Sequence, residues 1–173
     1  MSPLRLLIIL FLLLVPATAS VATESEYQVK AAMLYNFAKF VDWPADSFAN
    51  ENRITFCLVG KSPLNGAIQP MQGKSLKGRT VVIRPIVRPD EVDGCQILFI
   101  PQSERARASA YLQQSSHYPI LTVSDLEKFT VSGGMIGFFE DDDKIRFEIN
   151  LEAAQKRRLQ ISSYLLNLTR RGR

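Results

Sequence analysis

Two hydrophobic patterns alternate along the chain. Short, nearly continuous apolar runs predict strands that a sheet covers on both faces, and they occupy 54–59, 80–86, 97–100 and 120–123. Apolar residues at helical spacing predict helices between and around these runs, at 25–43, briefly from 63, at 103–114, briefly from 125, and at 151–166. We place the first helix between an N-cap at Ser25 and a stop before Pro44. A stretch rich in Gly, Lys and Arg at 73–79 predicts a loop.

The clearest strand pair lies near the C-terminus. Met135–Phe139 and Lys144–Ile149 flank the acidic run Glu140–Asp143, and apolar residues alternate with charged ones in the second strand. This alternation predicts an antiparallel hairpin with one buried and one solvated face. The acidic run is interpreted as its turn, because the spacing and the central glycine of an EF-hand calcium loop are missing. Asn150 is then expected to cap the last helix.

Together these elements predict the fold class. Strands that alternate with helices along a chain favour a three-layer α/β sandwich. Its sheet is expected to be largely parallel, with helices on both faces and the antiparallel hairpin at one edge.

Residues 1–19 have the layout of a secretory signal peptide. A start that carries Arg5 is followed by ten apolar residues at 6–15, and Ala17-Thr18-Ala19 has the small-x-small pattern of a cleavage site. The apolar run is shorter than the roughly 20 residues that a membrane-spanning helix needs. We therefore expect residues 20–173 to form one exported domain of ordinary size, located in the periplasm.

Charge argues against a nucleic-acid partner. Removing Arg5 with the signal leaves 20 basic and 17 acidic residues, a net charge of +3. The basic residues are spread over many short clusters rather than gathered into one footprint, so we expect no nucleic acid as a partner.

The residues typical of catalysis are sparse. His117 is the single histidine, and no Gly-x-Ser-x-Gly elbow or metal-ligand spacing accompanies it. A general base needs an orienting partner and a nucleophile within hydrogen-bond reach, so a lone surface histidine is the better interpretation. The sequence therefore predicts a protein that is not an enzyme and holds neither a metal nor a cofactor.

The turn Gly60-Lys61-Ser62 lies between a predicted strand and a predicted helix. Backbone N–H groups in such a turn can hold an anion, and the carboxyl ends of parallel strands are a usual place for a ligand. Most strand-to-helix turns look similar and bind nothing, so the turn is a candidate anion site beside the plainer alternative of a connecting loop.

Cys57 and Cys95 are the two cysteines of the chain. Exported proteins rarely leave two thiols unpaired, so we favour a disulfide over two buried thiols. In the chain-entropy model, closing a loop of about 39 residues stabilises a fold by roughly 4 kcal/mol.

Six segments carry a resemblance to a known family through their order and spacing: 30–44, which reads KAAMLYNFAKFVDWP, 95–100, 120–125, 133–136, 146–150 and 159–166. Together they resemble the YfiR family of periplasmic repressor proteins. The resemblance extends over about residues 27–169. Cys57 and Cys95 match the longer-range cysteine pair of the family, whereas a second pair found in some relatives is missing here.

This resemblance implies regulation rather than catalysis. Its best-understood type inhibits an inner-membrane diguanylate cyclase by binding its periplasmic domain, which affects cyclic-di-GMP and biofilm formation. An outer-membrane lipoprotein can sequester that repressor, and dimerisation and redox sensitivity belong to the same picture. The partner expected here is a diguanylate cyclase or sensor kinase of the inner membrane, with a homodimer also implied. A periplasmic sensor module for a small molecule is the alternative.

The first helix and its end carry four aromatic residues, more than one buried stripe needs: Tyr35, Phe37, Phe40 and Trp43. Aromatic anchors are favoured at protein interfaces, so these residues form our candidate partner interface. Core packing is the competing interpretation for most of them, because an amphipathic helix normally faces its own sheet.

Overall fold

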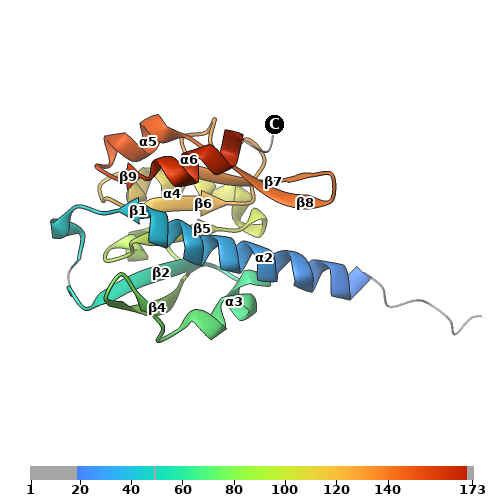
Figure 1. Ribbon diagram of the computed structural model, residues 1–173, viewed down its shortest axis with the longest axis horizontal. Helices are drawn as coiled ribbons and strands as arrows, with labels where there is room; N and C mark the ends of the chain where they lie inside the picture. The colour runs from blue at the N-terminus through green and yellow to red at the C-terminus, as the bar shows by residue number, and fades with distance from the viewer. Residues whose placement is uncertain (1–18, 49, 171–173) are drawn as a thin grey trace, which may run out of the picture.

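The computed structural model describes residues 19–48 and 50–170, and a seven-stranded sheet organises them (Figure 1). The sheet order is β3-β4-β2-β5-β6-β7-β8. The five central strands run parallel: β4 (Arg79–Ile86), β2 (Arg53–Val59), β5 (Ile97–Ile100), β6 (Leu121–Ser124) and β7 (Ile136–Asp141). Two antiparallel strands form the edges: β3 (Ser75–Leu76) and β8 (Lys144–Ile149). The predicted parallel sheet and its antiparallel edge hairpin are confirmed.

Each central strand contributes to two hydrophobic cores, one on each face of the sheet. In β2, Phe56 and Leu58 face one core, whereas Cys57 and Val59 face the other. This is the period-2 alternation of a strand buried on both faces, and it explains why these strands have continuous apolar sequences.

The helices divide between these two cores. Four contribute to the larger core: α2 (Ala19–Phe40), α3 (Leu64–Ala67), α5 (Leu151–Lys156) and α6 (Ser163–Arg170). The opposite core is covered by α4 (Ala108–Ser115) and the 3-10 helix η4 (Pro89–Val92). The three-layer α/β sandwich is therefore confirmed (Figure 1). Within the described residues, every helix is too short or too polar to cross a lipid bilayer.

Two element boundaries near the N-terminus need correction. Helix α2 begins at Ala19 rather than after Ser25, because the segment 19–25 contains no Gly or Pro that would end a helix, and Ala19, Ala22 and Glu24 favour one. It ends at Phe40, before the short strand β1 (Val41–Asp42). The predicted signal peptide, residues 1–19, lies outside the described residues except for its last position.

The predicted short helices were partly wrong. The segment that follows Asp125 forms turns instead of a helix, and Lys128 adopts a φ of 58° that interrupts helical geometry. The predicted helix 103–114 is present but opens as the 3-10 helix η5 (Gln102–Arg107) before α4. The predicted loop 73–79 contains β3, and a 3-10 turn η3 (Gln69–Met71) precedes it.

The predicted last helix is broken in two. Asn150 caps it as expected, because its side chain accepts a 2.9 Å hydrogen bond from the backbone N–H of Ala153. Arg158 then adopts a φ of 60°, and the strand β9 (Gln160–Ile161) pairs antiparallel with β1. The chain re-enters a helix only at α6, where the Ser162 hydroxyl accepts from the backbone N–H of Leu165 at 3.3 Å.

Candidate functional site

The disulfide joins the two middle strands of the parallel sheet. Cys57 lies in β2, Cys95 lies two residues before β5, and the two strands are neighbours in the ladder. The Cα atoms are 5.8 Å apart and the two sulfurs are bonded. Cys57 is 0% exposed and Cys95 is 4% exposed, so the bond is buried in the core beneath α4. The predicted pairing is confirmed.

A cation lies directly beside this bond. One terminal guanidinium nitrogen of Arg84, on β4, is 3.1 Å from the sulfur of Cys95 and 3.4 Å from that of Cys57. The same nitrogen donates to the backbone carbonyls of Glu91 at 3.1 Å and Asp93 at 2.5 Å. If the bond is reduced, this charge stabilises the thiolate that forms.

The four aromatic residues of the candidate interface point in different directions. Tyr35 donates from its hydroxyl to the Ser75 carbonyl at 3.1 Å, which ties α2 to β3. The Phe40 ring lies 4.7 Å from the ring of Tyr164 on α6. The Trp43 indole donates to the Gln96 carbonyl at 3.2 Å.

Phe37 needs correction as an interface residue. Its side chain is 1% exposed and packs against the rings of Phe138 and Phe147, at centroid distances of 5.7 and 4.8 Å. It therefore belongs to the larger core and offers no surface to a partner. The interface interpretation stays a prediction for Tyr35 and Phe40, and for Trp43.

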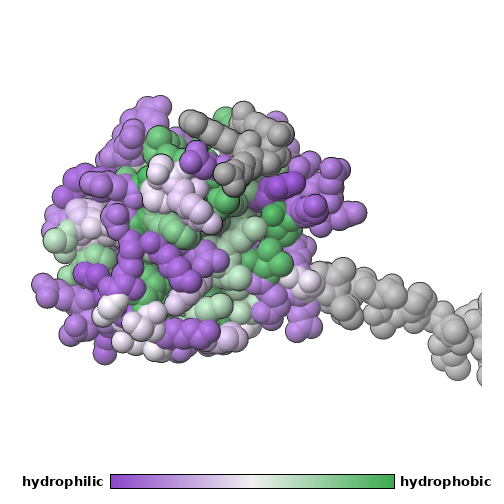
Figure 2. All heavy atoms as spheres, in the orientation of Figure 1, coloured by the Kyte–Doolittle hydropathy of each residue, from purple (hydrophilic) through white to green (hydrophobic). Residues whose placement is uncertain are grey.

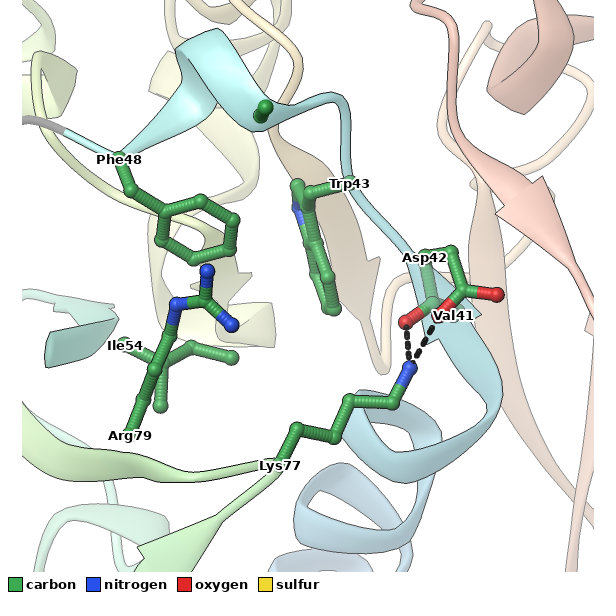
Figure 3. A pocket seen from close by; sticks show the side chains of 8 residues that line it. Val41, Asp42, Trp43, Phe48, Ile54, Lys77 and Arg79 are labelled. Carbon is green, nitrogen blue, oxygen red and sulfur yellow. Dashed lines mark hydrogen bonds and ion pairs between the residues drawn. The ribbon is translucent and has the colours of Figure 1, made fainter. Parts of the chain in front are cut away.

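Trp43 borders a pocket of about 210 Å³ that opens at the end of α2. Figure 3 shows the Arg79 guanidinium beneath the Phe48 ring, with the Trp43 indole on the other side. The guanidinium carbon is 3.9 Å from the centre of the Phe48 ring, a cation–π arrangement. Lys77 closes one end by donating to the Val41 carbonyl at 2.7 Å.

Arg79 lacks the partners that a half-buried guanidinium usually has. It forms no hydrogen bond or ion pair with the residues in 19–48 and 50–170, and its Nε is buried. Lys77, by contrast, pairs with Asp42. The pocket therefore combines aromatic walls with the Lys77–Asp42 ion pair and with Arg79, a cation that forms no ion pair with the described residues.

Backbone groups of the turn Gly60-Lys61-Ser62 form hydrogen bonds with neighbouring segments of the chain. The Gly60 N–H donates to the Ile86 carbonyl at 2.9 Å, and the Lys61 carbonyl accepts from the Ser103 hydroxyl at 3.3 Å. Gly60 has a φ of 61°, and a Cβ built there would lie 2.3 Å from a carboxylate oxygen of Glu104. A nearby carboxylate opposes an anion, so this geometry does not strengthen the anion-site prediction.

The other polar candidates of the sequence fall on the surface. His117 is exposed at the end of α4. Asp142 and Asp143 form the β7–β8 turn with φ values of 48° and 56°. The turn is shorter than the predicted run Glu140–Asp143, because Glu140 and Asp141 continue β7 and pair with β8. Among the described residues, no three His, Cys, Asp or Glu side chains converge on a possible metal position.

A buried charge network was missed at the sequence level. The Lys30 ammonium pairs with Asp125 at 3.1 Å, and both side chains are 6% exposed. It also pairs with Glu26, while the other Asp125 oxygen accepts from the backbone N–H of Gln102 at 2.8 Å. Burial alone would lower the pKa of Lys30, but the bonds and charges of Glu26 and Asp125 raise it above its ordinary value.

This network ties α2 to the carboxyl ends of β5 and β6. Tyr27 joins it through a 3.4 Å hydrogen bond to Asp125, and burial raises the pKa of its hydroxyl. A signal existed in the sequence, because Lys30 occupies the apolar stripe of α2 between Tyr27 and Leu34. A lysine on a buried stripe needs an acidic partner, although only the fold could identify it as Asp125.

The fold and the disulfide define a class: a three-layer α/β protein stapled across the middle of its parallel sheet by a buried bond. Comparison with known families is consistent with this class. Residues 27–170 match the family model DUF4154, described as YfiR/HmsC-like, and the chain belongs to this family. No curated protein matches the chain.

Proposed function

We propose that this protein is a non-enzymatic regulator of the periplasm that binds and inhibits an inner-membrane signalling protein. The observation that carries the proposal is membership of the YfiR/HmsC-like family over residues 27–170. The preferred partner is the periplasmic domain of a diguanylate cyclase, with a sensor kinase as the other form of the same proposal. Cyclic-di-GMP levels and biofilm formation would then respond to the protein.

Export is part of this proposal. Residues 1–19 act as a signal peptide, and residues 20–173 work in the oxidising periplasm. The buried disulfide between Cys57 and Cys95 supports this location, because such bonds persist in oxidising compartments. From the periplasm, control of nucleotide synthesis in the cytosol must pass through a membrane partner. An outer-membrane lipoprotein that sequesters the regulator, and a homodimer, complete the proposed system.

The partner surface that we favour surrounds β1. Phe40 precedes this strand and Trp43 follows it, and both are half-buried. Tyr164, 57% exposed, extends the surface from α6 because its ring lies against Phe40. Aromatic side chains that keep an exposed face are the residue types that most often anchor protein interfaces.

A cross-linking experiment tests this proposal. The tagged chain is cross-linked in living cells, purified from the inner-membrane fraction and analysed by mass spectrometry. We expect an integral membrane protein with a periplasmic domain and a cytoplasmic signalling domain, lost in a Tyr164→Ser variant. Val131→Ser is the matched control, because Val131 is 83% exposed on a distant turn. Recovery of soluble proteins only, from both variants and the unchanged chain, would overturn the proposal.

The Arg79 pocket favours a second candidate, a sensor module for a small molecule. A guanidinium over an aromatic ring, with no ion pair of its own among the described residues, suits a small ligand that combines a carboxylate with an apolar group. The one carboxylate in the pocket lining, Asp42, is paired with Lys77. A thermal-shift screen of small carboxylates tests it, because a ligand in excess of its dissociation constant raises the unfolding temperature. A stabilising compound that loses its effect in Arg79→Met supports this candidate. Absence of any stabilising compound removes it.

A further inference from the structure

The strand β8 leaves a long edge of the sheet open. It is the last strand of the seven, and β7 is its one neighbour in the part of the chain that the structure describes. The opposite edge strand, β3, has two residues, whereas β8 has six. Natural proteins blunt an edge by shortness, charged side chains, a proline or a bulge. The strand β8 is long and has neither a proline nor a bulge, and its charged residues, Lys144, Arg146 and Glu148, carry both signs.

The hairpin geometry shows which backbone groups of β8 are unused. The two-residue turn with positive φ at Asp142 and Asp143 is of the type I′ kind, in which the flanking pair, Asp141 and Lys144, is hydrogen-bonded. The 2.8 Å bond from the Asn150 N–H to the Met135 carbonyl has the same phase.

The intervening residues of β8 therefore direct their backbone N–H and C=O groups away from β7: Ile145, Phe147 and Ile149. Among the described residues, no side chain and no backbone group outside the ladder hydrogen-bonds to them. Three donors and three acceptors thus form one row along the open edge.

A groove of about 670 Å³ follows this edge, and apolar and charged side chains both line it. Met33 and Leu168 line it on the side of α2 and α6, and Phe139 lines it on the other face of the hairpin. Leu168 is 39% exposed and Phe139 is 45% exposed, both high for large apolar side chains. Figure 2 shows hydrophobic surface between α2 and the β7–β8 hairpin.

We propose that a second copy of this chain adds its own β8 to this edge, antiparallel, with the two-fold axis at Phe147. The two sheets then continue into one, and the groove of each copy is filled by apolar side chains of the other. The inference assigns an interface to the homodimer included in the proposed function, and it does not depend on the regulatory role.

The charges of β8 select this register. With the axis at Phe147, Ile145 lies opposite Ile149 of the second copy, and each such pair exchanges two backbone hydrogen bonds. Arg146 lies opposite Glu148 of the second copy, twice in the dimer, in the non-hydrogen-bonded positions where cross-strand side chains are closest.

The neighbouring registers place like charges opposite each other. An axis at Arg146 or at Glu148 sets that residue against itself, and an axis at Ile145 sets Lys144 against Arg146. A two-fold axis that passes between two residues would place a backbone group that faces β7 opposite one that faces the open edge. Among the registers centred on residues 145–148, the Phe147 register is therefore the one that satisfies both the backbone and the charges.

The Arg146 guanidinium has donors left for Glu148 of the second copy. Its Nε reaches Asp141 at 3.5 Å, and it makes no hydrogen bond with the residues that the structure describes. Glu148 accepts one hydrogen bond from the Thr130 hydroxyl, and a carboxylate has further acceptor positions. The Phe147 ring itself is anchored against Phe37, so the centre of the interface is pre-ordered.

Charge reversal with sedimentation equilibrium tests this interface on the chain purified from the periplasm. We expect a dimer, whose dissociation constant rises at least about tenfold in Arg146→Glu and in Glu148→Arg, since each places two like-charge pairs across the strands. The double variant restores opposite charges and returns the constant to within about threefold. Lys144→Glu is the matched control, because Asn150 lies opposite Lys144, and it leaves the constant unchanged.

Each other outcome overturns the interface in a recognisable way. A monomer at all concentrations overturns both this interface and the homodimer of the proposed function. A dimer that all four variants leave intact keeps the homodimer and overturns the β8 interface. An equal loss in Lys144→Glu and Arg146→Glu, or no rescue in the double variant, shows a general charge effect and likewise overturns it. Circular dichroism confirms that each variant is folded.

Discussion

Removal of the disulfide is the sharpest test of how this fold is held together. Replacing both Cys57 and Cys95 with alanine opens a loop whose ends are 38 residues apart in sequence. The chain-entropy model assigns about 4 kcal/mol to a loop of this length. Because the bond joins adjacent central strands and is buried, we expect the free energy of unfolding to fall by about that amount.

Urea denaturation measures this change. Trp43 is the single tryptophan of the chain and is half-buried, so its fluorescence reports unfolding without added probes. With a slope of about 2 kcal/mol/M, the midpoint should fall by about 2 M. The unchanged chain in reducing buffer is the control, and its curve should approach that of the double variant. A loss below about 1 kcal/mol in both cases would refute the cross-link argument.

Three further predictions concern buried groups. Asp125→Asn leaves Lys30 with Glu26 as its one acidic partner, so the free energy of unfolding should fall by about 3 kcal/mol in urea denaturation; a loss under about 1 kcal/mol would contradict a structural role for the pair. Because the folded pKa of Lys30 is raised, its contribution to the free energy of unfolding is complete below pH 10.5 and is lost as the pH rises through that folded pKa. Thermal unfolding should therefore shift to lower temperature at alkaline pH, and the shift should be smaller in a Lys30→Met variant. Equal alkaline shifts in both proteins would exclude Lys30 as the source. Gly134→Ala should destabilise the fold by about 2 kcal/mol or more, since its Cβ would lie 2.1 Å from the Phe129 ring, and unchanged thermal stability would show that the ring can move.

The sequence pattern alone predicted those elements that depend on burial or on contacts between residues close in the sequence. The continuous apolar run of β2 identified a strand covered on both faces, and Asn150 was recognised as a cap because its contact with Ala153 spans three residues. The disulfide was predictable since the predicted export and an even cysteine count left few alternatives.

Long-range contacts explain the errors. The last predicted helix follows a good apolar stripe, yet pairing of β9 with β1 across the chain and the positive φ of Arg158 override it. The carboxylate of Glu104 beside the turn at Gly60 comes from a later segment, so the local sequence of this turn, which stays a candidate anion site, could not show it. Lys30 and Asp125 are 95 residues apart, so periodicity showed one charge of the pair and not the other.

The central claim is that the chain acts from the periplasm on cytosolic nucleotide signalling, and cyclic-di-GMP measured by mass spectrometry tests it most directly. The gene is deleted and the strain is complemented with either the full chain or residues 20–173 alone. We predict that cyclic-di-GMP rises on deletion, returns to its original level with the full chain, and stays high with the form that lacks the signal. Unchanged cyclic-di-GMP on deletion, or equal rescue by the form confined to the cytosol, would contradict the account.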